Sequence, residues 1–295
     1  MRRRTTRSAT PANATQGLRR LGLGMPTPPP FVGRAPERAA LAQSLAESAV
    51  SVVQGAVGSG KTRLARMVAT DTEAAFALGV AFVRVLPGDR AIAVRARVER
   101  ALGALPGGLV DALASQQRLL VIDDTHHLGD ADIATELVAM LPGDGALGRV
   151  LFLTRDSLPL PRSLGAFQLE LGGLDETAAR ELWAHLEETY GPTPAAAVDA
   201  AITRTRGMPL ALRREYARAL SGAAAWTIDA LSADARVALE ALSVLRLPAA
   251  PAAVAAMMPV LAPEPALVDL VSRQLIDPLE DGRFVVHDVV RDEVL

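Results

Sequence analysis

Hydrophobic and polar positions along the chain follow two periods, and the change between them predicts two kinds of architecture. Up to about residue 171, short β-rich apolar runs alternate with stretches of helical spacing. This alternation predicts a parallel sheet with helices on both faces and a ligand at the carboxyl ends of the strands. The predicted strands are Ser51–Gln54, Val80–Val85, Leu119–Asp124, Val150–Arg155 and Phe167–Leu171, and helices are expected at Pro36–Ser48, Arg63–Ala69 and Ala91–Leu105.

From Asp175 onward the pattern is helical, and it then ends in a hairpin. Helical spacing covers Asp175–Thr189, Ala195–Arg206, Leu210–Ser221, Ala233–Leu245, Ala250–Met258 and Glu264–Leu275. Two short apolar runs then flank Glu280-Asp281-Gly282, and an Asp-Gly pair between apolar runs indicates a β-hairpin. Three helices followed by a hairpin predict a winged helix for residues 226–295, with a further helix beginning at His287.

The first 30 residues differ from the rest of the chain. They lack hydrophobic periodicity, contain six arginines before the first acidic residue, Glu37, and end in Pro26-Thr27-Pro28-Pro29-Pro30. We interpret them as a disordered Arg/Pro-rich tail that ends in a stiff linker. An organelle transit peptide has a similar composition, whereas a secretory signal would need an apolar segment that residues 5–16 do not provide.

Composition excludes several classes of function. Half of the 295 residues are hydrophobic but only 3% are aromatic, so the cores must consist of Leu, Val and Ala. The net charge of −2 gives no reason to expect bulk nucleic-acid binding. The absence of cysteine excludes disulfides and thiolate chemistry. No apolar run is long enough to span a membrane, and we therefore expect a cytoplasmic protein.

The segment from Gly55 to Thr62 reads Gly-x-x-x-x-Gly-Lys-Thr between a predicted strand and a predicted helix. This is the phosphate-binding loop of P-loop NTPases, in which backbone N–H groups and a helix N-terminus surround phosphate oxygens. Lys61 should reach the β- and γ-phosphates, and the Thr62 hydroxyl should bind Mg²⁺. The residues expected to contact the nucleotide here are Gly55, Val57, Gly58, Ser59, Gly60, Lys61, Thr62 and Arg63.

The placement of lysine supports this interpretation. Lys61 is the only lysine among 31 basic residues, and every other cation is arginine. The exception falls where a compact ammonium is required and a planar guanidinium would not fit. A chance glycine-rich turn would not explain this coincidence.

Two further strands end in residues suited to ATP hydrolysis. Asp123 and Asp124 follow four large apolar residues, which matches a Walker B strand. Asp123 should hold Mg²⁺ together with Thr62, and Asp124 is the candidate base. The aspartates could instead cap the next helix. Arg155 ends another strand, where it could detect the γ-phosphate or be an ordinary surface arginine. We expect His126 and His127 in a surface loop and assign no metal beyond Mg²⁺.

With these pieces in place, residues 31–295 resemble the STAND class of signalling NTPases, in its NB-ARC-like branch. Phe31-Val32-Gly33-Arg34 resembles the family's opening motif, which implies that Val32, Gly33 and Arg34 contact nucleotide. Gly207-Met208-Pro209-Leu210 resembles the G-L-P-L motif, which implies that Pro209 contacts nucleotide. Val286-His287-Asp288 resembles the M-H-D motif, which implies that His287 contacts the β-phosphate of ADP, although a surface or capping histidine is the simpler alternative.

The resemblance implies a P-loop nucleotide-binding domain at 31–173, a helical domain at 174–222 and a winged-helix domain at 226–295. It implies a switch that binds ATP or ADP with Mg²⁺, hydrolyses ATP slowly, and opens to form a homo-oligomer when ATP is bound. The expected partners are an unidentified sensor or effector protein. The resemblance covers neither the N-terminal effector nor the C-terminal repeat sensor that this class usually carries.

Three other interpretations remain open. One is a DNA-associated AAA-type ATPase of the replication-initiator kind, which also combines an ATPase with a winged helix. Residues 265–274, its candidate reading helix, contain one arginine and one aspartate, whereas a DNA-reading helix normally carries a denser basic face. Nucleic-acid binding is therefore not expected, although the arginine-rich tail could bind it nonspecifically. The second is a fragment of a transcriptional regulator, and the third is a nucleotide-binding scaffold without turnover.

Overall fold

The computed structural model describes residues 30–129, 141, 143, 145–221, 228–245, 247–258, 263–279 and 282–295. Residues 1–29 of the predicted tail and the acidic hairpin tip at 280–281 lie outside these described residues. The chain divides into two compact units. Residues 31–177 and 206–210 form the sheet unit, and residues 178–205 and 211–295 form the helical unit. The finer division into domains at 174–222 and 226–295 stays a prediction.

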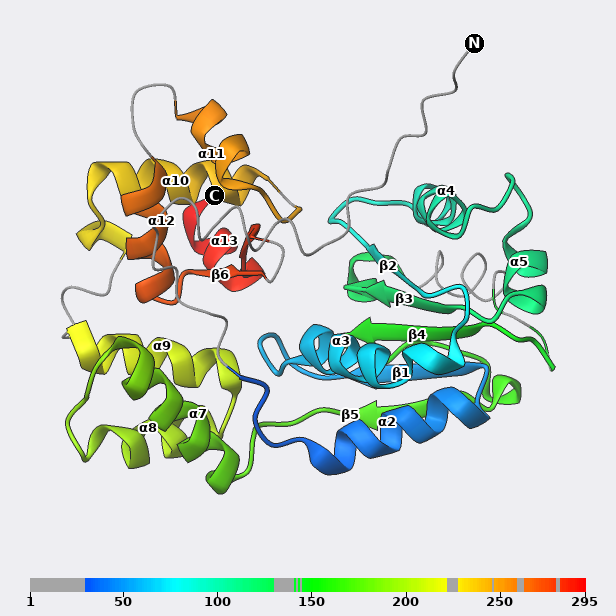
Figure 1. The fold of residues 1–295 in the computed structure, drawn as a ribbon, viewed down its shortest axis with the longest axis horizontal. Helices are drawn as coiled ribbons and strands as arrows, with labels where there is room; N and C mark the ends of the chain where they lie inside the picture. The colour runs from blue at the N-terminus through cyan, green and yellow to red at the C-terminus, as the bar shows by residue number, and fades with distance from the viewer. Residues whose placement is uncertain are drawn as a thin grey trace, which may run out of the picture. The chain divides into compact units, whose positions relative to one another are not determined.

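Five parallel strands form the sheet of the first unit, in the order β2-β3-β4-β1-β5 (Figure 1). The prediction of a parallel sheet is therefore confirmed. The strands are β1 (Val50–Gln54), β2 (Val80–Arg84), β3 (Leu119–Asp123), β4 (Arg149–Thr154) and β5 (Phe167–Glu170). Because β1 pairs with both β4 and β5, it occupies an interior position, and the loop that follows it leaves the sheet between two neighbouring strands.

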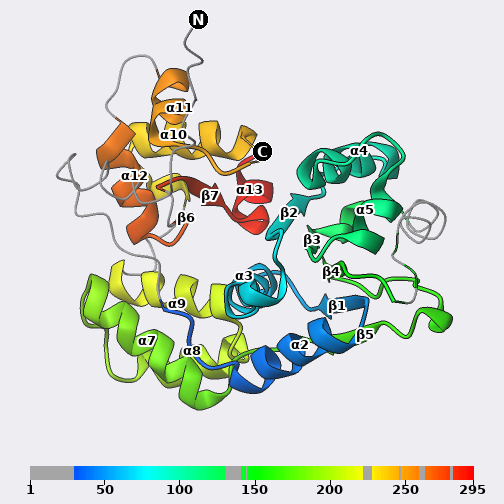
Figure 2. The ribbon, with the colours of Figure 1, turned by 45° about the vertical axis from the view of Figure 1, so that its right-hand side comes forward.

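Helices cover both faces of this sheet, because its strands bury side chains on both sides. Val50 and Val52 of β1 belong to one core cluster with α4 and α5, whereas Val53 belongs to a second cluster with α2 and α3 (Figure 2). Burying each such Val or Leu side chain contributes about 1.5–3 kcal/mol relative to leaving it exposed. The helices are α2 (Ala35–Glu47), α3 (Lys61–Asp71), α4 (Ala91–Leu102) and α5 (Leu109–Ser115), with 3₁₀ turns η1 (Glu73–Ala75), η2 (Thr125–His127) and η4 (Arg162–Leu164).

The structure corrects one predicted helix. The stretch expected to be helical to Leu105 ends at Leu102, because Gly103 adopts the left-handed conformation (φ 67°) that terminates helices. A separate helix, α5, begins at Leu109 after Pro106, Gly107 and Gly108. Sequence reasoning missed α5 because a seven-residue helix carries too few turns for a clear period.

The strand register aligns the carboxyl ends of the central strands. Gln54 pairs with Thr154, and Arg84 pairs with Asp123. The residues that directly follow these strands, including Gly55, Asp124 and Arg155, are therefore delivered to one edge of the sheet, as expected for a ligand site in an open α/β fold.

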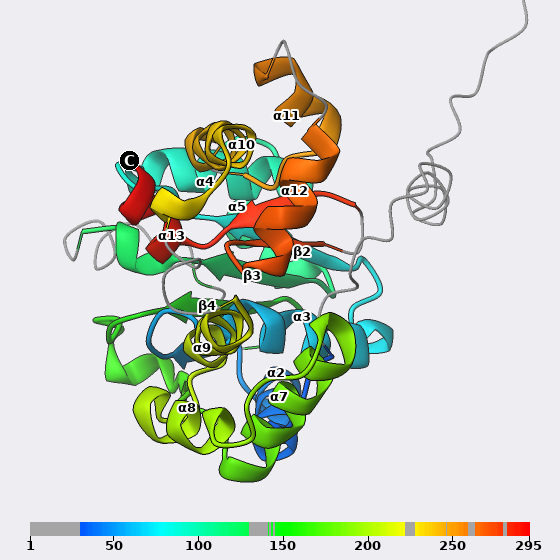
Figure 3. The same ribbon diagram turned by 90° about the vertical axis from the view of Figure 1, so that its left-hand side faces the viewer.

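In the helical unit, residues from Leu231 to Val290 share one core cluster and include a two-stranded antiparallel sheet (Figure 3). The predicted hairpin is confirmed, with Ile276 opposite Val286, and the winged-helix assignment stays a prediction. No helix in the described part of the chain is both long and apolar enough to cross a membrane. The elements are α7 (Glu176–Tyr190), α8 (Ala197–Thr205), α9 (Pro209–Ser221), η5 (Ile228–Ala230), α10 (Ala233–Val244), α11 (Pro251–Met257), α12 (Pro263–Ser272), β6 (Ile276–Pro278), β7 (Phe284–Val286) and α13 (Asp288–Val294).

Candidate nucleotide-binding site

The loop between β1 and α3 has the backbone conformation that an anion-binding loop needs. Gly58 and Gly60 have φ angles of 76° and 97°, a region that residues with a side chain rarely adopt. Gly60 is the N-cap of α3 and, having no side chain, provides no side-chain cap to the first N–H groups of the helix. A side chain at Gly60 would meet no atom within 4 Å. The positive dipole end of the helix thus lies beside open space at Gly60.

Two glycines of the loop allow other segments to approach closely. A Cβ atom at Gly55 would lie 2.6 Å from the Leu171 carbonyl oxygen, and one at Gly58 would lie 2.4 Å from Leu210 Cβ. Leu210 also donates its N–H to the Gly58 carbonyl at 3.3 Å. The Gly-Met-Pro-Leu segment, far along the chain, therefore packs against the top of the loop. This brings Pro209 next to the loop, and a contact between Pro209 and nucleotide remains a prediction.

The ammonium of Lys61 is buried in the loop. Its Nζ donates to the carbonyl oxygens of Gly55 at 2.7 Å and Ala56 at 3.0 Å. Burial lowers the pKa of Lys61, and the charges of Asp123 and Asp124 oppose that shift. An incoming phosphate would offer this ammonium a charged acceptor in place of two neutral carbonyls.

One buried polar atom of the loop has no partner. Ser59 Oγ makes no hydrogen bond among the described residues, although Ser59 is only 1% exposed. A buried hydroxyl without a partner costs free energy, which a phosphate oxygen in the loop would recover. The open position at Gly60, the uncapped helix and this hydroxyl together fit a polyphosphate.

Thr62 and Asp123 meet at the point where a divalent cation would bind. Thr62 Oγ1 donates to Asp123 Oδ2 at 2.7 Å, and Asp124 N–H donates to Asp123 Oδ1 at 2.9 Å. Burial, and then the charge of Asp124, raise the pKa of Asp123 to about 6. A hydroxyl and a carboxylate, completed by water and phosphate oxygens, are the ligands that Mg²⁺ prefers. The donor set therefore fits Mg²⁺.

The candidate base Asp124 is held by an arginine that sequence reasoning missed. Arg84 Nε lies 2.6 Å from Asp124 Oδ2. Asp124 itself has a φ of 58°, a left-handed conformation that aspartate, asparagine and histidine adopt more often than other non-glycine residues. The register of the sheet pairs Arg84 with Asp123 and so places Arg84 beside the following aspartate, an arrangement that the sequence does not show. Arg84 thus belongs to the candidate site.

The structure brings Arg155 close to the same groups. Its charge acts on Lys61 and on His126, in both cases lowering the pKa of the affected side chain. Detection of a terminal phosphate by Arg155 remains a prediction.

The prediction that His126 and His127 lie in a surface loop is wrong. Both residues lie half-buried in η2, directly after the Walker B strand. Thr125, which is fully buried, donates its hydroxyl to the Leu153 carbonyl at 3.1 Å and so holds the turn against β4. The two rings lie 4.1 Å apart between their centroids.

Arg34 contacts protein groups on both sides of the phosphate loop. Its guanidinium donates to Glu37 at 2.8 Å, to the Ser59 carbonyl at 3.4 Å and to the Gly172 carbonyl. Gly33 and Arg34 both have positive φ angles, and Val32 is buried. Arg34 thus donates a hydrogen bond to a carbonyl of the phosphate loop. Contacts of Val32, Gly33 and Arg34 with nucleotide remain predictions.

His287 belongs to the helical unit. Its Nε2 lies 2.7 Å from Asp277 Oδ2, and Asp277 also receives a bidentate guanidinium from Arg213 of α9. Arg213 in turn donates Nε to Gln274 at 2.7 Å. Sequence reasoning missed this network, because nothing local distinguishes Arg213 from the other arginines. The expected phosphate contact of His287 remains a prediction.

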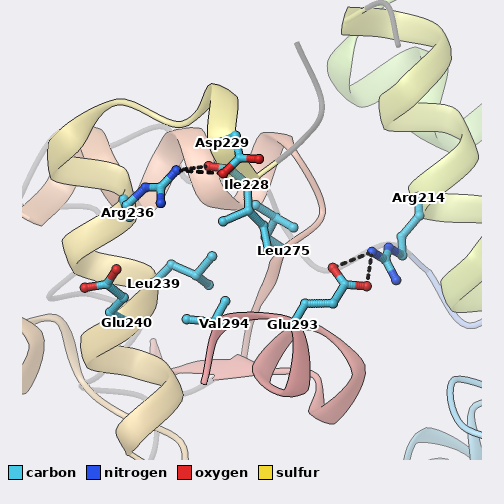
Figure 4. Close-up of a pocket in the computed structure, with 9 residues that line it drawn as sticks. All are labelled: Arg214, Ile228, Asp229, Arg236, Leu239, Glu240, Leu275, Glu293 and Val294. Carbon is cyan, nitrogen blue, oxygen red and sulfur yellow. Dashed lines mark hydrogen bonds and ion pairs between the residues drawn. The ribbon is translucent and has the colours of Figure 1, made fainter. Parts of the chain in front are cut away.

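The helical unit also contains a cavity of about 430 Å³ between α9, α10 and α13 (Figure 4). Its charged lining residues largely neutralise one another, with Arg214 on Glu293 at 2.9 Å and Arg236 on Asp229 at 3.2 Å. Pairing of this kind leaves few groups to recognise a ligand, and none of the predicted site residues lines the cavity.

Comparison with known proteins supports an assignment for part of the chain. A protein-family model described as AAA domain matches residues 46–159, which include the loop, Asp123 and Asp124. These residues form a P-loop ATPase domain of the AAA type. No curated protein matches the chain by sequence.

Among solved structures, the chain resembles a signal transduction ATPase with numerous domains (STAND) from Pyrococcus horikoshii that carries a tetratricopeptide repeat sensor. The TM-score is 0.61 at 18% identity, over 92% of this chain and 43% of that one. The chain therefore spans less than half the length of this structural relative, and the likeness shows the fold. The Orc1 protein of Aeropyrum pernix, solved in complex with DNA, matches with a TM-score of 0.49 at 16% identity, over 90% of this chain and 93% of that one.

Proposed function

We propose that this chain is an ATP/ADP-controlled switch of the STAND type, in which slow hydrolysis of ATP controls domain opening and oligomerisation. The P-loop ATPase domain supplies the nucleotide site. The helical and C-terminal segments supply the parts that respond to it.

The packing of Leu210 on Gly58 is the observation that carries this proposal. A plain P-loop ATPase needs no later segment on its phosphate loop. Here the first residues of α9 touch the loop, with Leu210 N–H on the Gly58 carbonyl. Three residues farther along the same helix, Arg213 holds Asp277, which pairs with His287. Pro209 and Leu210 belong to the sheet unit and Arg213 belongs to the helical unit, so α9 connects the two units along the chain.

Each group near the loop has a role in hydrolysis under this proposal. Lys61 leaves the loop carbonyls and neutralises the β- and γ-phosphates. Thr62 and Asp123 would hold Mg²⁺, which would supply positive charge to the phosphate oxygens. Asp124, oriented by Arg84, accepts a proton from the attacking water, and Arg155 stabilises charge on the terminal phosphate. The Arg84 guanidinium, 2.6 Å from Asp124 Oδ2, holds the carboxylate in place.

In the resting state ADP would be held by Lys61, Pro209 and His287. Exchange for ATP would release His287, freeing the C-terminal segment to associate with a second copy. We expect a sensor or effector protein as the partner of this switch, and we expect it to bind the released C-terminal segment.

The DNA-associated alternative gains no support from the described residues. Arg273, just after the candidate reading helix α12, donates Nε to Asp269 at 2.8 Å, so an acidic neighbour already offsets its charge. A nucleic-acid-binding helix would direct such cations at phosphates.

The experiment measures which nucleotide the purified protein carries. Protein is denatured and the released nucleotide identified chromatographically for the wild type, Lys61→Ala, His287→Ala and Arg66→Ala. We expect ADP from the wild type, none from Lys61→Ala and reduced ADP from His287→Ala. The affinity of His287→Ala for ATP, measured by calorimetric titration, should be unchanged. Arg66→Ala is the matched control, because it removes an exposed cation of the same helix that lies 5.1 Å from the Phe82 ring.

Wild-type-like nucleotide retention in Lys61→Ala would remove the site assignment. Equal loss of ATP and ADP binding in His287→Ala would leave the ATPase assignment intact and remove the role of His287 in the switch.

A further inference from the structure

Two backbone segments of the sheet unit cross at a pair of glycines, Gly173 and Gly207. A Cβ atom at Gly173 would overlap the Arg206 carbonyl oxygen, and a Cβ atom at Gly207 would overlap the Leu174 carbonyl oxygen. The Leu174 N–H donates to the Gly207 carbonyl at 2.8 Å across the same crossing. Each glycine therefore makes room for the other segment, and the two backbones are in direct contact.

The two glycines differ in what their backbone angles require. Gly207 comes shortly after α8 ends at Thr205 and has a φ of 72°, so a helix-terminating glycine would be expected there in any case. Gly173 does not have a positive φ. The lack of space for a side chain, and not a left-handed conformation, therefore calls for glycine at this position.

Both crossing segments also contact the phosphate loop. On the first segment, the Gly172 carbonyl accepts from the Arg34 guanidinium, which also donates to the Ser59 carbonyl of the loop at 3.4 Å. On the second segment, the Leu210 N–H donates to the Gly58 carbonyl at 3.3 Å, and Leu210 is buried. The crossing directly follows the first of these contacts along the chain and shortly precedes the second.

The second segment needs an anchor on the sheet unit. Residues 206–210 belong to that unit, but residues 178–205 before them and 211–295 after them belong to the helical unit. A phosphate loop binds its ligand with backbone N–H groups held in one conformation, so a segment that fixes the loop contributes to affinity by preorganisation. The crossing supplies the anchor that keeps residues 206–210 beside the loop.

We propose that Gly173 and Gly207 are positioning residues for nucleotide binding, because their crossing holds Leu210 on Gly58 and thereby keeps the phosphate loop in its anion-binding conformation. The proposal rests on the proposed function and adds two residues to that same site. Both glycines act through Leu210 and make no contact with the nucleotide themselves.

The test measures the dissociation constant of ADP with Mg²⁺ by calorimetry. For Gly173→Ala and Gly207→Ala we expect the constant to rise by about tenfold or more, because a displaced Leu210 leaves the loop less ordered. Gly103→Ala is the matched control, because Gly103 ends α4 with a φ of 67° but a side chain there would meet no described atom within 4 Å. This variant has the same conformational cost, and its constant should stay within about twofold of the wild type.

Gly207→Asn separates the lack of space from the backbone conformation. Asparagine tolerates the left-handed conformation better than most residues, but its Cβ atom would still overlap the Leu174 carbonyl oxygen. We therefore expect Gly207→Asn to lose affinity for ADP as Gly207→Ala does. Wild-type affinity in Gly207→Asn would overturn the proposal.

A double variant tests whether Gly207 acts through Leu210. Leu210→Ala removes the Cγ and Cδ atoms that lie against Gly58. If the two residues act together, the loss of affinity in Gly207→Ala/Leu210→Ala should be smaller than the product of the two single losses. Losses that multiply in full would show that Gly207 supports the fold independently of Leu210, which overturns the proposal.

Hydrogen exchange in the wild type tests the same proposal if the glycine variants fail to fold in a thermal melt. Linkage requires that ADP stabilise whatever supports its binding, so the N–H groups of Leu174 and Leu210 should both exchange more slowly when ADP is bound. Unchanged exchange at Leu174 overturns the inference. A wild type that binds no nucleotide overturns the proposed function as well, whereas unaltered ADP affinity in Gly173→Ala and Gly207→Ala overturns this inference alone.

Discussion

Asp123 of the sheet unit and Asp277 of the helical unit are both carboxylates on strands, yet their surroundings have opposite effects. Burial and Asp124 raise the pKa of Asp123 to about 6. Burial alone would also raise the pKa of Asp277, but the charges of Arg213 and His287 outweigh it and hold that pKa well below its usual range. Asp277 has its cations within the chain, whereas Asp123 forms no ion pair among the described residues.

The difference separates a structural ion pair from a site prepared for a ligand. Arg213 and Asp277 satisfy each other, and Gln274 completes the arginine's hydrogen bonds. At Asp123 the oxygens contact only neutral donors, the Thr62 hydroxyl and the Asp124 N–H. A buried carboxylate left without a cation is costly on its own, and the cost is recovered when Mg²⁺ binds.

The largest effect is expected at Asp277. Asp277→Asn removes the counter-charge of the buried Arg213 and should lower the free energy of unfolding by about 3–5 kcal/mol. Urea denaturation followed by circular dichroism measures this loss. A change below about 1 kcal/mol would mean that Arg213 finds another acceptor and that the pair is not structural.

Asp123→Asn should act in the opposite direction in the absence of ligand. Asparagine still accepts the Thr62 hydrogen bond but carries no buried charge, so we expect a stability gain of about 1–3 kcal/mol at pH 7. Thermal melts with and without Mg²⁺ and ATP measure how much stability each variant gains from the ligands. The wild type should gain stability from the ligands and Asp123→Asn should not. A loss of ligand-free stability in this variant would make Asp123 a structural residue like Asp277.

Acid should remove the contribution of Asp277 gradually. A carboxylate whose folded pKa lies below its unfolded value of 3.8 adds stability above that value and loses it as the pH falls through the folded pKa. The stability gap between wild type and Asp277→Asn should therefore be constant from about pH 5 to 7 and shrink by about 1 kcal/mol or more below pH 3.8. A gap that shrinks instead between pH 5 and 7 would show that the Asp277 carboxyl does not control this pH dependence.

Particular residues show how far sequence reasoning reached. The phosphate loop was predictable because its function depends on adjacent residues, with glycines at fixed spacing and the one lysine at Lys61. Asp123 was predictable because a buried apolar strand ending in acid is a local pattern. His126 was misplaced because the turn η2 that contains it is held against β4 by the Thr125 hydroxyl on the Leu153 carbonyl, a contact between residues 28 positions apart in the chain.

The sequence by itself determined the class of fold, the phosphate loop and the order of its elements, because periodicity and glycine spacing act through neighbours in the chain. Only the tertiary structure decided that Leu210 lies on Gly58, that Arg84 holds Asp124, and that Arg213 holds Asp277. Thirty arginines offer many possible partners for each carboxylate, and the pairs are selected by which segments the packed sheet and helices bring together.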